Sequence, residues 1–393
     1  MLISYRFNNF CSFNCESEFS MCSATGKVKR RFPDNFVTFE QGYDLLKTSV
    51  IVGENAGGKS NFINSLKFLK SLFTSNEEVR AIHSYTNSVS LRTEETPKQK
   101  FAISFLAENG KIYEYTVEID KEGIVSESLK SALKRKAAFT NIFSIERTAD
   151  GRNYSVSKGK ATIEIKTLLK NSNKNFGLFV CKLALLGNED AAQTVQWIMD
   201  KLYLESVFTE RETDVKKQEN DLAIIQDEKY LDIFRMVDYS ICGVEVDREK
   251  PYSKSLIIRE DAEGNRYSRE LQMDSTGVRE FFVWAVQIFR VVYENKTVFA
   301  DEMDRVLNPI LSDRVIAFIN GAEHKGQFIF STHNVLHLDL KNYMKEQIYF
   351  ITKDKDSLTS ELYSLADFPE VRYETTKVYE FYMKGILGGT AFE

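Results

Sequence analysis

The sequence predicts an α/β fold with a mixed parallel sheet, an adjoining antiparallel β-sheet and a helical insertion lobe. Three observations predict it. Short apolar runs at 48–52, 297–300 and 328–332 each end in polar residues, as parallel strands do when their carboxyl ends carry a site. Residues 101–157 alternate between apolar and polar side chains, which favours antiparallel strands. Residues 160–236 carry apolar side chains at helical spacing.

The order of these patterns divides the chain into three segments. Residues 1–159 hold the first apolar strand and the antiparallel sheet, residues 160–239 form the helical insertion, and residues 240–393 return to strands and helices. We expect the first and third segments to fold together around one mixed sheet. The insertion is expected to project beside them as a lobe or a short arm.

Strand patterns open the first segment. Residues 1–20 alternate, and a further strand is expected around 36–39. The runs 101–106 and 112–119 flank Asn109-Gly110, a dipeptide that favours a tight hairpin turn. Further strands of the antiparallel sheet are expected at 124–129, 142–147 and 154–156.

Helical spacing continues through the insertion and returns near the end of the chain. The charged stretch 209–228 is interpreted as a solvated helix face or loop, with a short helical arm as the alternative. Helices are expected at 162–169, 176–186, 191–203 and 277–293, and strands at 242–246, 255–259 and 266–270.

The composition of the 393 residues is that of an ordinary globular protein, with 43% hydrophobic and 28% charged side chains. A net charge of -5 gives no general argument for binding nucleic acid, so any basic surface must be local. The five cysteines have no partners at zinc-binding spacing, and no window approaches the roughly 18 consecutive apolar residues of a membrane span. We therefore expect a reduced, cytoplasmic protein that does not associate with membranes.

The stretch from Gly53 to Ser60 is a complete G-x-x-x-x-G-K-[ST] phosphate-binding loop between a strand and a helix, the context that this motif needs. Its glycines let successive backbone N–H groups turn toward one anion, and the helix N-terminus adds partial positive charge. Lys59 is expected to reach the β- and γ-phosphates, and Ser60 to offer a hydroxyl to Mg²⁺. The nucleotide-binding residues are expected to be Gly53, Glu54, Asn55, Ala56, Gly57, Gly58, Lys59, Ser60 and Asn61.

Polar residues at the ends of the other two apolar strands are candidates for the same site. Asp301 is expected to hold Mg²⁺, directly or through water, and Glu302 to polarise the attacking water as a general base. A surface turn after a core strand is the alternative for this pair. His333 ends a strand that should run parallel to the other two, so it could contact the γ-phosphate.

Ser275, Thr276 and Gly277 stand directly before an apolar helix. A simple helix cap explains a Ser-x-Gly sequence by itself, although such a helix start also binds anions. Its significance here comes from its place in the order of motifs.

That order is a phosphate loop, a large insertion, a Ser-x-Gly helix, an Asp-Glu strand and a strand ending in histidine. It resembles the heads of ATP-binding-cassette (ABC) ATPases, and more closely the branch shared by SMC, Rad50, RecF and OLD-type proteins. In this resemblance Gly53 to Ser60 match Walker A, Ser275 to Gly277 the signature motif, and Thr297 to Glu302 Walker B. His333 matches the switch histidine, and Asp304 to Pro309 occupy the D-loop position.

Closer still, the chain resembles the small bacterial AAA-15/AAA-21 ATPases of anti-phage and abortive-infection systems. The residues that carry this resemblance are Asn55 to Asn61, Ser331 to Asn334 and the tail from Tyr382 to Gly389. The chain departs from the pattern at Ile386, where a basic residue is frequent, and at Asn308, where many relatives have a histidine. The resemblance covers the two ends of the chain more than its middle.

The resemblance implies an ABC-ATPase-like head that binds ATP and Mg²⁺ and works as a homodimer or another even-numbered oligomer. Each ATP would lie between Walker A of one copy and the signature motif of the other, so that Ser275, Thr276 and Gly277 act across the dimer. Hydrolysis through Glu302 would release or reset the dimer.

Four functions follow as hypotheses. The first is an ATPase switch of a phage-defence system that controls a separate toxic effector, such as a TOPRIM-type nuclease. The second is a RecF- or Rad50-like DNA-repair ATPase, for which Lys27 to Arg31, Lys130 and Lys134 to Lys136 are the candidate basic surface, with ordinary solvated lysines as the alternative. A self-contained nuclease built on Asp354-Lys355-Asp356 is disfavoured, since about forty residues from there cannot hold a TOPRIM domain of about 100. The long insertion argues against a transporter ATPase.

Overall fold

The fold was analysed in a computed structural model of the chain. It describes residues 1–74, 98–151, 153–171, 177–205, 215–303 and 308–388. The predicted helix at 176–186, stretch at 209–228, D-loop and C-terminal tail extend in part outside these residues. Within the described ranges, no helix combines the length and the apolar composition that crossing a bilayer would need.

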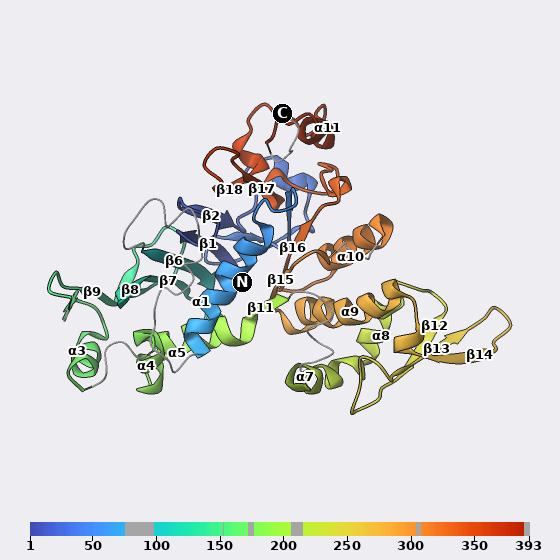
Figure 1. The fold of residues 1–393 in the computed structure, drawn as a ribbon, viewed down its shortest axis with the longest axis horizontal. Helices are drawn as coiled ribbons and strands as arrows, with labels where there is room; N and C mark the ends of the chain where they lie inside the picture. Colours follow the sequence, from blue (N-terminus) through green and yellow to red (C-terminus); the bar gives the residue numbers. More distant parts are fainter. Residues whose placement is uncertain (75–97, 152, 172–176, 206–214, 304–307, 389–393) are drawn as a thin grey trace.

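A mixed sheet lies at the centre of the molecule, with the strand order β11-β15-β16-β5-β17-β18 (Figure 1). Its strands from β11 to β17 are parallel, and β18 pairs with β17 in the antiparallel sense. The three apolar runs of the sequence are thus parallel strands of one sheet, as predicted, and they lie next to one another. The sheet comprises β11 (Leu202–Glu205), β15 (Thr297–Ala300), β16 (Gln327–Thr332), β5 (Thr48–Gly53), β17 (Ile348–Lys353) and β18 (Ser360–Ser364).

A second, antiparallel sheet lies beside it, in the order β10-β9-β8-β7-β6-β1-β2 (Figure 1). The predicted hairpin is present, since β6 pairs with β7 around a turn in which Gly110 has a φ of 76°. The α/β fold class with an adjoining antiparallel sheet is therefore confirmed. The strands are β1 (Leu2–Asn8), β2 (Ser17–Ser20), β6 (Gln99–Leu106), β7 (Ile112–Asp120), β8 (Gly123–Ala132), β9 (Thr140–Arg147) and β10 (Tyr154–Val156).

Both faces of the parallel sheet are covered, which explains why its strands are apolar throughout. Helix α1 (Lys59–Thr74) packs on one face, where Phe62 and Leu66 join Ile51 and Phe299 in a cluster that continues into the antiparallel sheet. Helix α9 (Thr276–Glu294) packs on the opposite face, in a separate cluster with β15 and β16. The parallel sheet thus holds the phosphate-loop helix and the Ser-x-Gly helix on opposite sides.

The segment 160–239 contributes to both of these clusters. Its first part packs against the antiparallel sheet, where the indole of Trp197 stacks on Phe105 with ring centroids 4.3 Å apart. The buried Glu127 of β8 accepts the N–H groups of Phe179 and Val180 at the start of α4, each at 2.8 Å. The elements of this part are α3 (Thr162–Asn171), α4 (Phe179–Leu185), α5 (Glu189–Gln196) and the π-helix η3 (Trp197–Lys201).

The predicted helix at 191–203 is wrong at its C-terminal end. Leu202 and Tyr203 belong to β11, which pairs in parallel with β15 at the edge of the central sheet. The reason is that a short apolar run fits a helical and a strand period equally well, and only the available sheet edge decides between them.

The second part of the segment packs under α9. Helices α7 (Val215–Ile225) and α8 (Glu228–Phe234) contact α9, and a small antiparallel sheet with the order β12-β13-β14 extends from there to one end of the molecule (Figure 1). The strands of this small sheet are β12 (Ile241–Glu245), β13 (Leu256–Glu260) and β14 (Arg266–Glu270).

Short elements complete the described chain. The strand pair of β3 (Phe36–Thr38) and β4 (Asp44–Leu46) precedes the phosphate loop, and α10 (Pro309–Gly321) and α11 (Val378–Met383) belong to the last segment. The 3₁₀ turns are η1 (Val28–Arg31), η4 (Leu271–Met273), η6 (Val335–His337), η7 (Lys345–Gln347) and η8 (Leu365–Asp367).

Candidate functional site

The carboxyl ends of β5, β15 and β16 lie at one edge of the central sheet. The register pairs Val52 with Thr332 and Phe330 with Ala300, so the residues that follow these strands emerge side by side. Because the strands are parallel, polar groups far apart in the sequence meet where the apolar runs stop.

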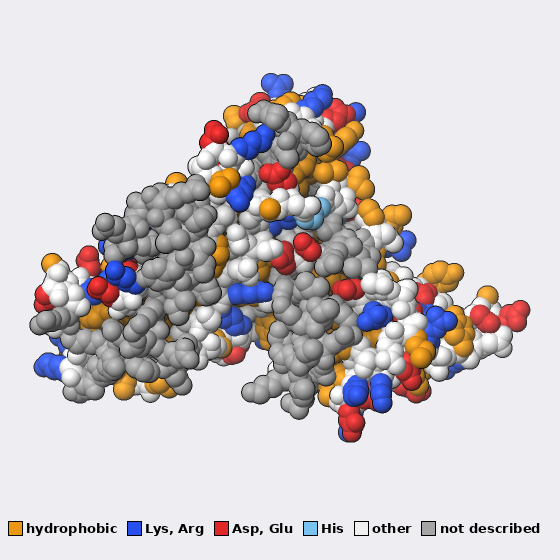
Figure 2. Space-filling model, in the orientation of Figure 1, with side chains coloured by type: hydrophobic (Ala, Val, Ile, Leu, Met, Phe, Trp, Pro, Cys, Tyr) orange, Lys and Arg blue, Asp and Glu red, His pale blue; other side chains and the backbone are white. Residues whose placement is uncertain are grey.

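A cavity of about 140 Å³ opens at this edge. The structure brings together here the phosphate loop, the residue after β15 and the residue after β16. A histidine is exposed near the centre of the corresponding face, with acidic and basic side chains next to it (Figure 2). The residues that line the cavity are Glu54, Asn55, Ala56, Gly58, Lys59, Ser60, Asn61, Glu302 and His333.

The phosphate loop needs its glycines for steric reasons. A Cβ on Gly53 would lie 2.3 Å from the carbonyl oxygen of Ile351, which belongs to the neighbouring strand β17. Gly58 has a φ of 121°, and a Cβ there would lie 2.5 Å from Oγ of Ser360. Ala56 also has a positive φ, of 61°, which L residues seldom adopt. The loop is therefore packed closely against β17 and β18 while its other side faces the cavity.

Lys59 is buried, and its ammonium group lies inside the loop. Nζ donates hydrogen bonds to the carbonyl oxygens of Gly53 at 2.7 Å and Glu54 at 2.9 Å, and it lies 3.5 Å from Nδ1 of His333. The positive charge is thus fixed at the mouth of the loop, next to the histidine that ends β16. This arrangement suits an anion that both groups contact.

Asp301 and Glu302 are linked through Ser331 of the adjacent strand. The Ser331 hydroxyl donates to Oδ1 of Asp301 at 2.6 Å and accepts the N–H of Glu302 at 2.8 Å. Glu302 has a φ of 51°, a strained conformation for a non-glycine residue. Glu302 lines the cavity, whereas Asp301, the residue before it, does not.

Sequence reasoning missed two serines that support the loop. The Ser360 hydroxyl donates to the carbonyl oxygen of Gly57 at 2.6 Å, and its Oγ shares a hydrogen bond with Oγ of Ser12 at 2.7 Å. Ser12 Oγ accepts from the side chain of Asn61 at 2.8 Å. Ser12 and Ser360 are 348 positions apart, so no local pattern could have paired them. Ser331 belongs to the apolar run 328–332, but its role as a bridge between Asp301 and Glu302 depends on the pairing of β15 with β16.

Ser275, Thr276 and Gly277 do not line the cavity of their own chain. Ser275 is the N-cap of α9, and its Oγ accepts the N–H of Val278 at 3.3 Å. The helix cap is thus present, and the start of α9, where Ser275 and Thr276 are exposed, lies outside the cavity of the same chain. Of the D-loop position, residues 304–307 lie outside the described residues, and Asn308 caps α10 through the N–H of Leu311.

The described residues hold no group of three or more His, Cys, Asp or Glu side chains placed to bind a metal. An Mg²⁺ ion in an ATP site takes most of its ligands from phosphate oxygens and water, so Ser60 and Asp301 remain adequate candidates. Asp354, in the run considered for a nuclease, instead accepts the N–H groups of Asp356 and Ser357, at 3.1 and 2.6 Å. That run is a hydrogen-bonded turn.

Comparisons with known proteins agree with the predicted family. Residues 49–339 match a family described as "AAA domain, putative AbiEii toxin, Type IV TA system". This match confirms the resemblance to the AAA-21 group. No protein with a curated description matches the chain.

Similar solved structures include SMC head domains. The SMC head domain from Thermotoga maritima is 14% identical, with a TM-score of 0.40 over 92% of this chain and 98% of that one. The Smc head domain with an extended coiled coil, bound to the C-terminal domain of ScpA derived from Pyrococcus furiosus, is 14% identical, with a TM-score of 0.45 over 98% of each chain.

Proposed function

Because the chain belongs to the AAA-domain family described as putative AbiEii toxin of type IV toxin–antitoxin systems, we propose that it is an ATP-driven molecular switch. In this proposal it binds and hydrolyses ATP with Mg²⁺, pairs with a second copy when ATP is bound, and controls a separate effector in a bacterial anti-phage system. The observation that carries the proposal is the convergence of Lys59, Glu302 and His333 on the cavity of the phosphate loop.

The residues at this cavity fit a nucleoside triphosphate. Gly53 and Gly58 let the loop pack against β17 and β18, and the side that faces the cavity includes the helix start, where backbone N–H groups can bind phosphate oxygens. The ammonium group of Lys59 is bonded to carbonyl oxygens of the loop, and these bonds can be exchanged for stronger, charge-assisted bonds to phosphate. Ser60 is exposed at the cavity, where its hydroxyl can serve as an Mg²⁺ ligand.

The chain's own residues then divide the work. ATP supplies the phosphoryl group, and Mg²⁺ neutralises charge on its oxygens when both are bound. Glu302 orients a water and accepts its proton. Asp301, which accepts a hydrogen bond from Ser331, would hold Mg²⁺ directly or through water. His333 lies next to Lys59 and reports whether a third phosphate is present.

The place of α9 supports a site shared between two copies. The start of α9 is exposed and lies outside the cavity of its own chain, and a helix N-terminus in such a place can bind an anion that another copy presents. If a second copy offers its nucleotide to this helix start, ATP joins the two surfaces, and hydrolysis separates them. ATP would then control assembly, which is what a switch requires.

The defence role rests on the family description and on the sequence resemblance. Toxin–antitoxin systems work by holding a harmful activity until a signal arrives, and an ATP-dependent dimer provides such a controlled state. We propose a separately encoded effector, with a TOPRIM-type nuclease as the leading candidate.

A RecF- or Rad50-like DNA-repair ATPase is the alternative, and the ion pairs of the structure weaken it. Lys29 pairs with Asp44 at 2.6 Å, and Arg31 pairs with Glu374. Charges already balanced by acids contribute little to phosphate binding. Affinity for a DNA duplex that falls steeply between 50 and 200 mM salt, by roughly a thousandfold or more, would favour the alternative.

The proposal is tested by measuring the mass of the purified protein with and without ATP and Mg²⁺. Glu302→Gln should bind ATP, remain a dimer or an even-numbered assembly, and turn ATP over roughly a hundredfold more slowly, since it loses its general base. Lys59→Ala should stay unassociated. Asp356→Asn, which like Glu302→Gln converts a carboxylate to an amide but lies on the surface, should behave like the parent. A parent whose mass is unaffected by ATP, or a Glu302→Gln variant with parental turnover, would refute the switch.

A further inference from the structure

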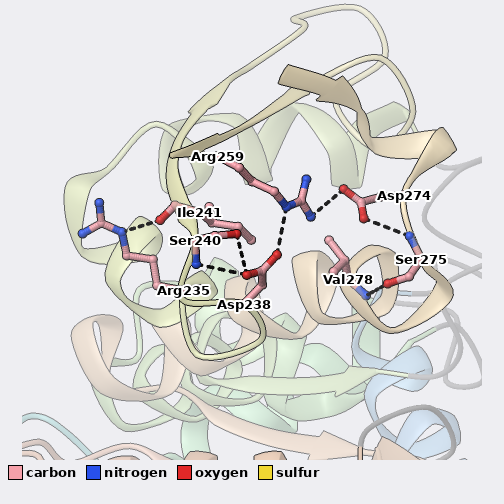
Figure 3. A network of polar contacts seen from close by, with 8 residues as sticks. All are labelled: Arg235, Asp238, Ser240, Ile241, Arg259, Asp274, Ser275 and Val278. Atoms are coloured by element: carbon pink, nitrogen blue, oxygen red, sulfur yellow. Dashed lines mark hydrogen bonds and ion pairs between the residues drawn. The ribbon is translucent and has the colours of Figure 1, made fainter. Parts of the chain in front are cut away.

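The start of α9 is held by a network of polar contacts that begins in the β12–β14 sheet (Figure 3). Arg259 of β13 donates from Nε to Oδ2 of Asp238 at 2.8 Å, and its Nη2 lies 2.8 Å from Oδ2 of Asp274. The side chains of Arg259 and Asp274 are only 8% and 6% exposed. The guanidinium group therefore joins two carboxylates in a mostly buried position directly before the helix.

Asp274 passes this constraint on to the helix cap. Its Oδ1 accepts the N–H of Ser275 at 2.9 Å, and Ser275 Oγ accepts the N–H of Val278 (Figure 3). The backbone N–H and the side-chain hydroxyl of Ser275 are thus both oriented by hydrogen bonds. The conformation of the cap depends on where Arg259 holds the Asp274 carboxylate.

The other end of the network is anchored in the connection from α8 to β12. Oδ1 of Asp238 accepts the N–H and the hydroxyl of Ser240, at 3.0 and 2.7 Å. Arg235 donates from Nε to the carbonyl oxygen of Ile241 at 2.8 Å. Arg259 of β13 therefore links the connection 235–241 to the start of α9 through its two carboxylate partners.

The charges of this network decide what the helix start can bind. A carboxylate beside a helix N-terminus occupies the same positive potential that a phosphate would use, and it repels that phosphate. Arg259 draws the Asp274 carboxylate to itself and compensates its charge. Without Arg259, the buried Asp274 carboxylate and the half-buried Asp238 carboxylate would lose their shared cation, which is costly unless they move or take up protons.

We infer that Arg259 is a positioning residue for the segment Ser275–Gly277: it holds and neutralises Asp274 so that the start of α9 can receive a phosphate group presented by a second copy of the chain. This inference rests on the proposed ATP-dependent dimer. Arg259 does not touch the nucleotide, and its effect passes through Asp274 and the helix cap.

The first test compares Arg259→Ala with the double variant Arg259→Ala/Asp274→Asn. Arg259→Ala should bind ATP as a single chain with an affinity within about twofold of the parent, yet lose ATP-dependent association and at least about tenfold in turnover. The double variant should recover most of both, because the introduced amide can still accept the Ser275 N–H but carries no charge. Arg259→Lys should recover part, since an ammonium group spans two carboxylates less well than a guanidinium fork. A thermal melt of each variant checks that it is folded.

The second test mixes two variants that each lack one half of the composite site. Arg259→Ala keeps its phosphate loop, and Lys59→Ala keeps its α9 start, so a mixed pair has one intact composite site. Because neither variant pairs with itself, only mixed pairs form, and each has one working site of two, so equal amounts should restore up to about half of the parental turnover. Mixing Arg259→Ala with Ser275→Ala, where both defects lie on the α9 side, should restore nothing.

Different outcomes would refute the role of Arg259 and the proposed ATP-dependent switch. A parent that hydrolyses ATP without associating would refute the switch, and the inference would fall with it. If the parent associates but Arg259→Ala keeps parental turnover, the inference alone is refuted. It is also refuted if the folded double variant stays as inactive as Arg259→Ala, or if mixing with Lys59→Ala restores no activity.

Discussion

Replacing Gly58 by alanine tests whether the phosphate loop is held in place by its packing against β18. Gly58 has a φ of 121°, and a Cβ there would lie 2.5 Å from Oγ and 3.0 Å from Cβ of Ser360. The Ser360 hydroxyl would have to turn away from its two hydrogen-bond partners, the carbonyl oxygen of Gly57 and Oγ of Ser12. The substitution therefore imposes a backbone cost and a packing cost at once.

The two costs can be estimated separately. A side chain in this backbone region costs on the order of 1–3 kcal/mol. The two hydrogen bonds that Ser360 gives up contribute about 1 kcal/mol each. We expect Gly58→Ala to lower the free energy of unfolding by about 3–5 kcal/mol. If only about 1.4 kcal/mol of this appears as distortion of the binding-competent loop, ATP affinity falls tenfold.

Other glycines of the chain provide matched controls for denaturant unfolding and for ATP titration. Gly187 has a φ of 86° with nothing within 4 Å of a Cβ, so Gly187→Ala should cost only the backbone term of about 1–2 kcal/mol. Gly321, at the end of α10, has open space and no positive φ, so Gly321→Ala should be neutral or slightly stabilising. Neither control should change ATP affinity.

A double-mutant cycle with Ser360→Ala identifies the packing term. Because Gly58→Ala already breaks the Ser360 hydrogen bonds, the double variant should lose about 1–2 kcal/mol less than the sum of the single variants. Gly58→Ala with parental stability and parental ATP affinity would refute the reasoning. So would strict additivity in the cycle, since it would mean that Ser360 does not contact the loop.

Two further predictions concern the carboxylates of the chain. Ser331→Ala removes the hydroxyl that joins Asp301 to the Glu302 N–H. In steady-state kinetics its turnover should fall about tenfold, while ATP titration should show little change in affinity. An unchanged turnover would exclude this bridge from catalysis. Burial raises the pKa of Glu127 from 4.5 to about 7, so between these pH values the folded chain holds a proton that the unfolded chain releases. Relative to Glu127→Gln, the parent should therefore lose about 3 kcal/mol of unfolding free energy as pH rises from 4 to 8, and parallel stability curves for the two proteins would contradict it.

The sequence predicted the elements that local signals specify by themselves. The phosphate loop, the β6–β7 hairpin and α9 are each specified by a dipeptide, a motif or a periodic stretch that needs no distant partner. The same reasoning failed at Leu202 and Tyr203, where a free sheet edge next to β15 turned an apolar run into a strand. It also did not anticipate that residues 160–239 would pack into two separate clusters.

For this protein, the sequence by itself determined the chemical groups of the candidate site: a phosphate loop, an acidic pair, a histidine and an anion-binding helix start. Only the tertiary structure decided which of them meet. The parallel register of β5, β15 and β16 brings Lys59, Glu302 and His333 to one cavity, and the start of α9 lies outside that cavity. Only the folded chain joins Ser12 to Ser360 and Arg259 to Asp274. The physical reason is that hydrogen bonds and ion pairs depend on distance in space, and pairing between strands sets that distance whatever the separation along the chain.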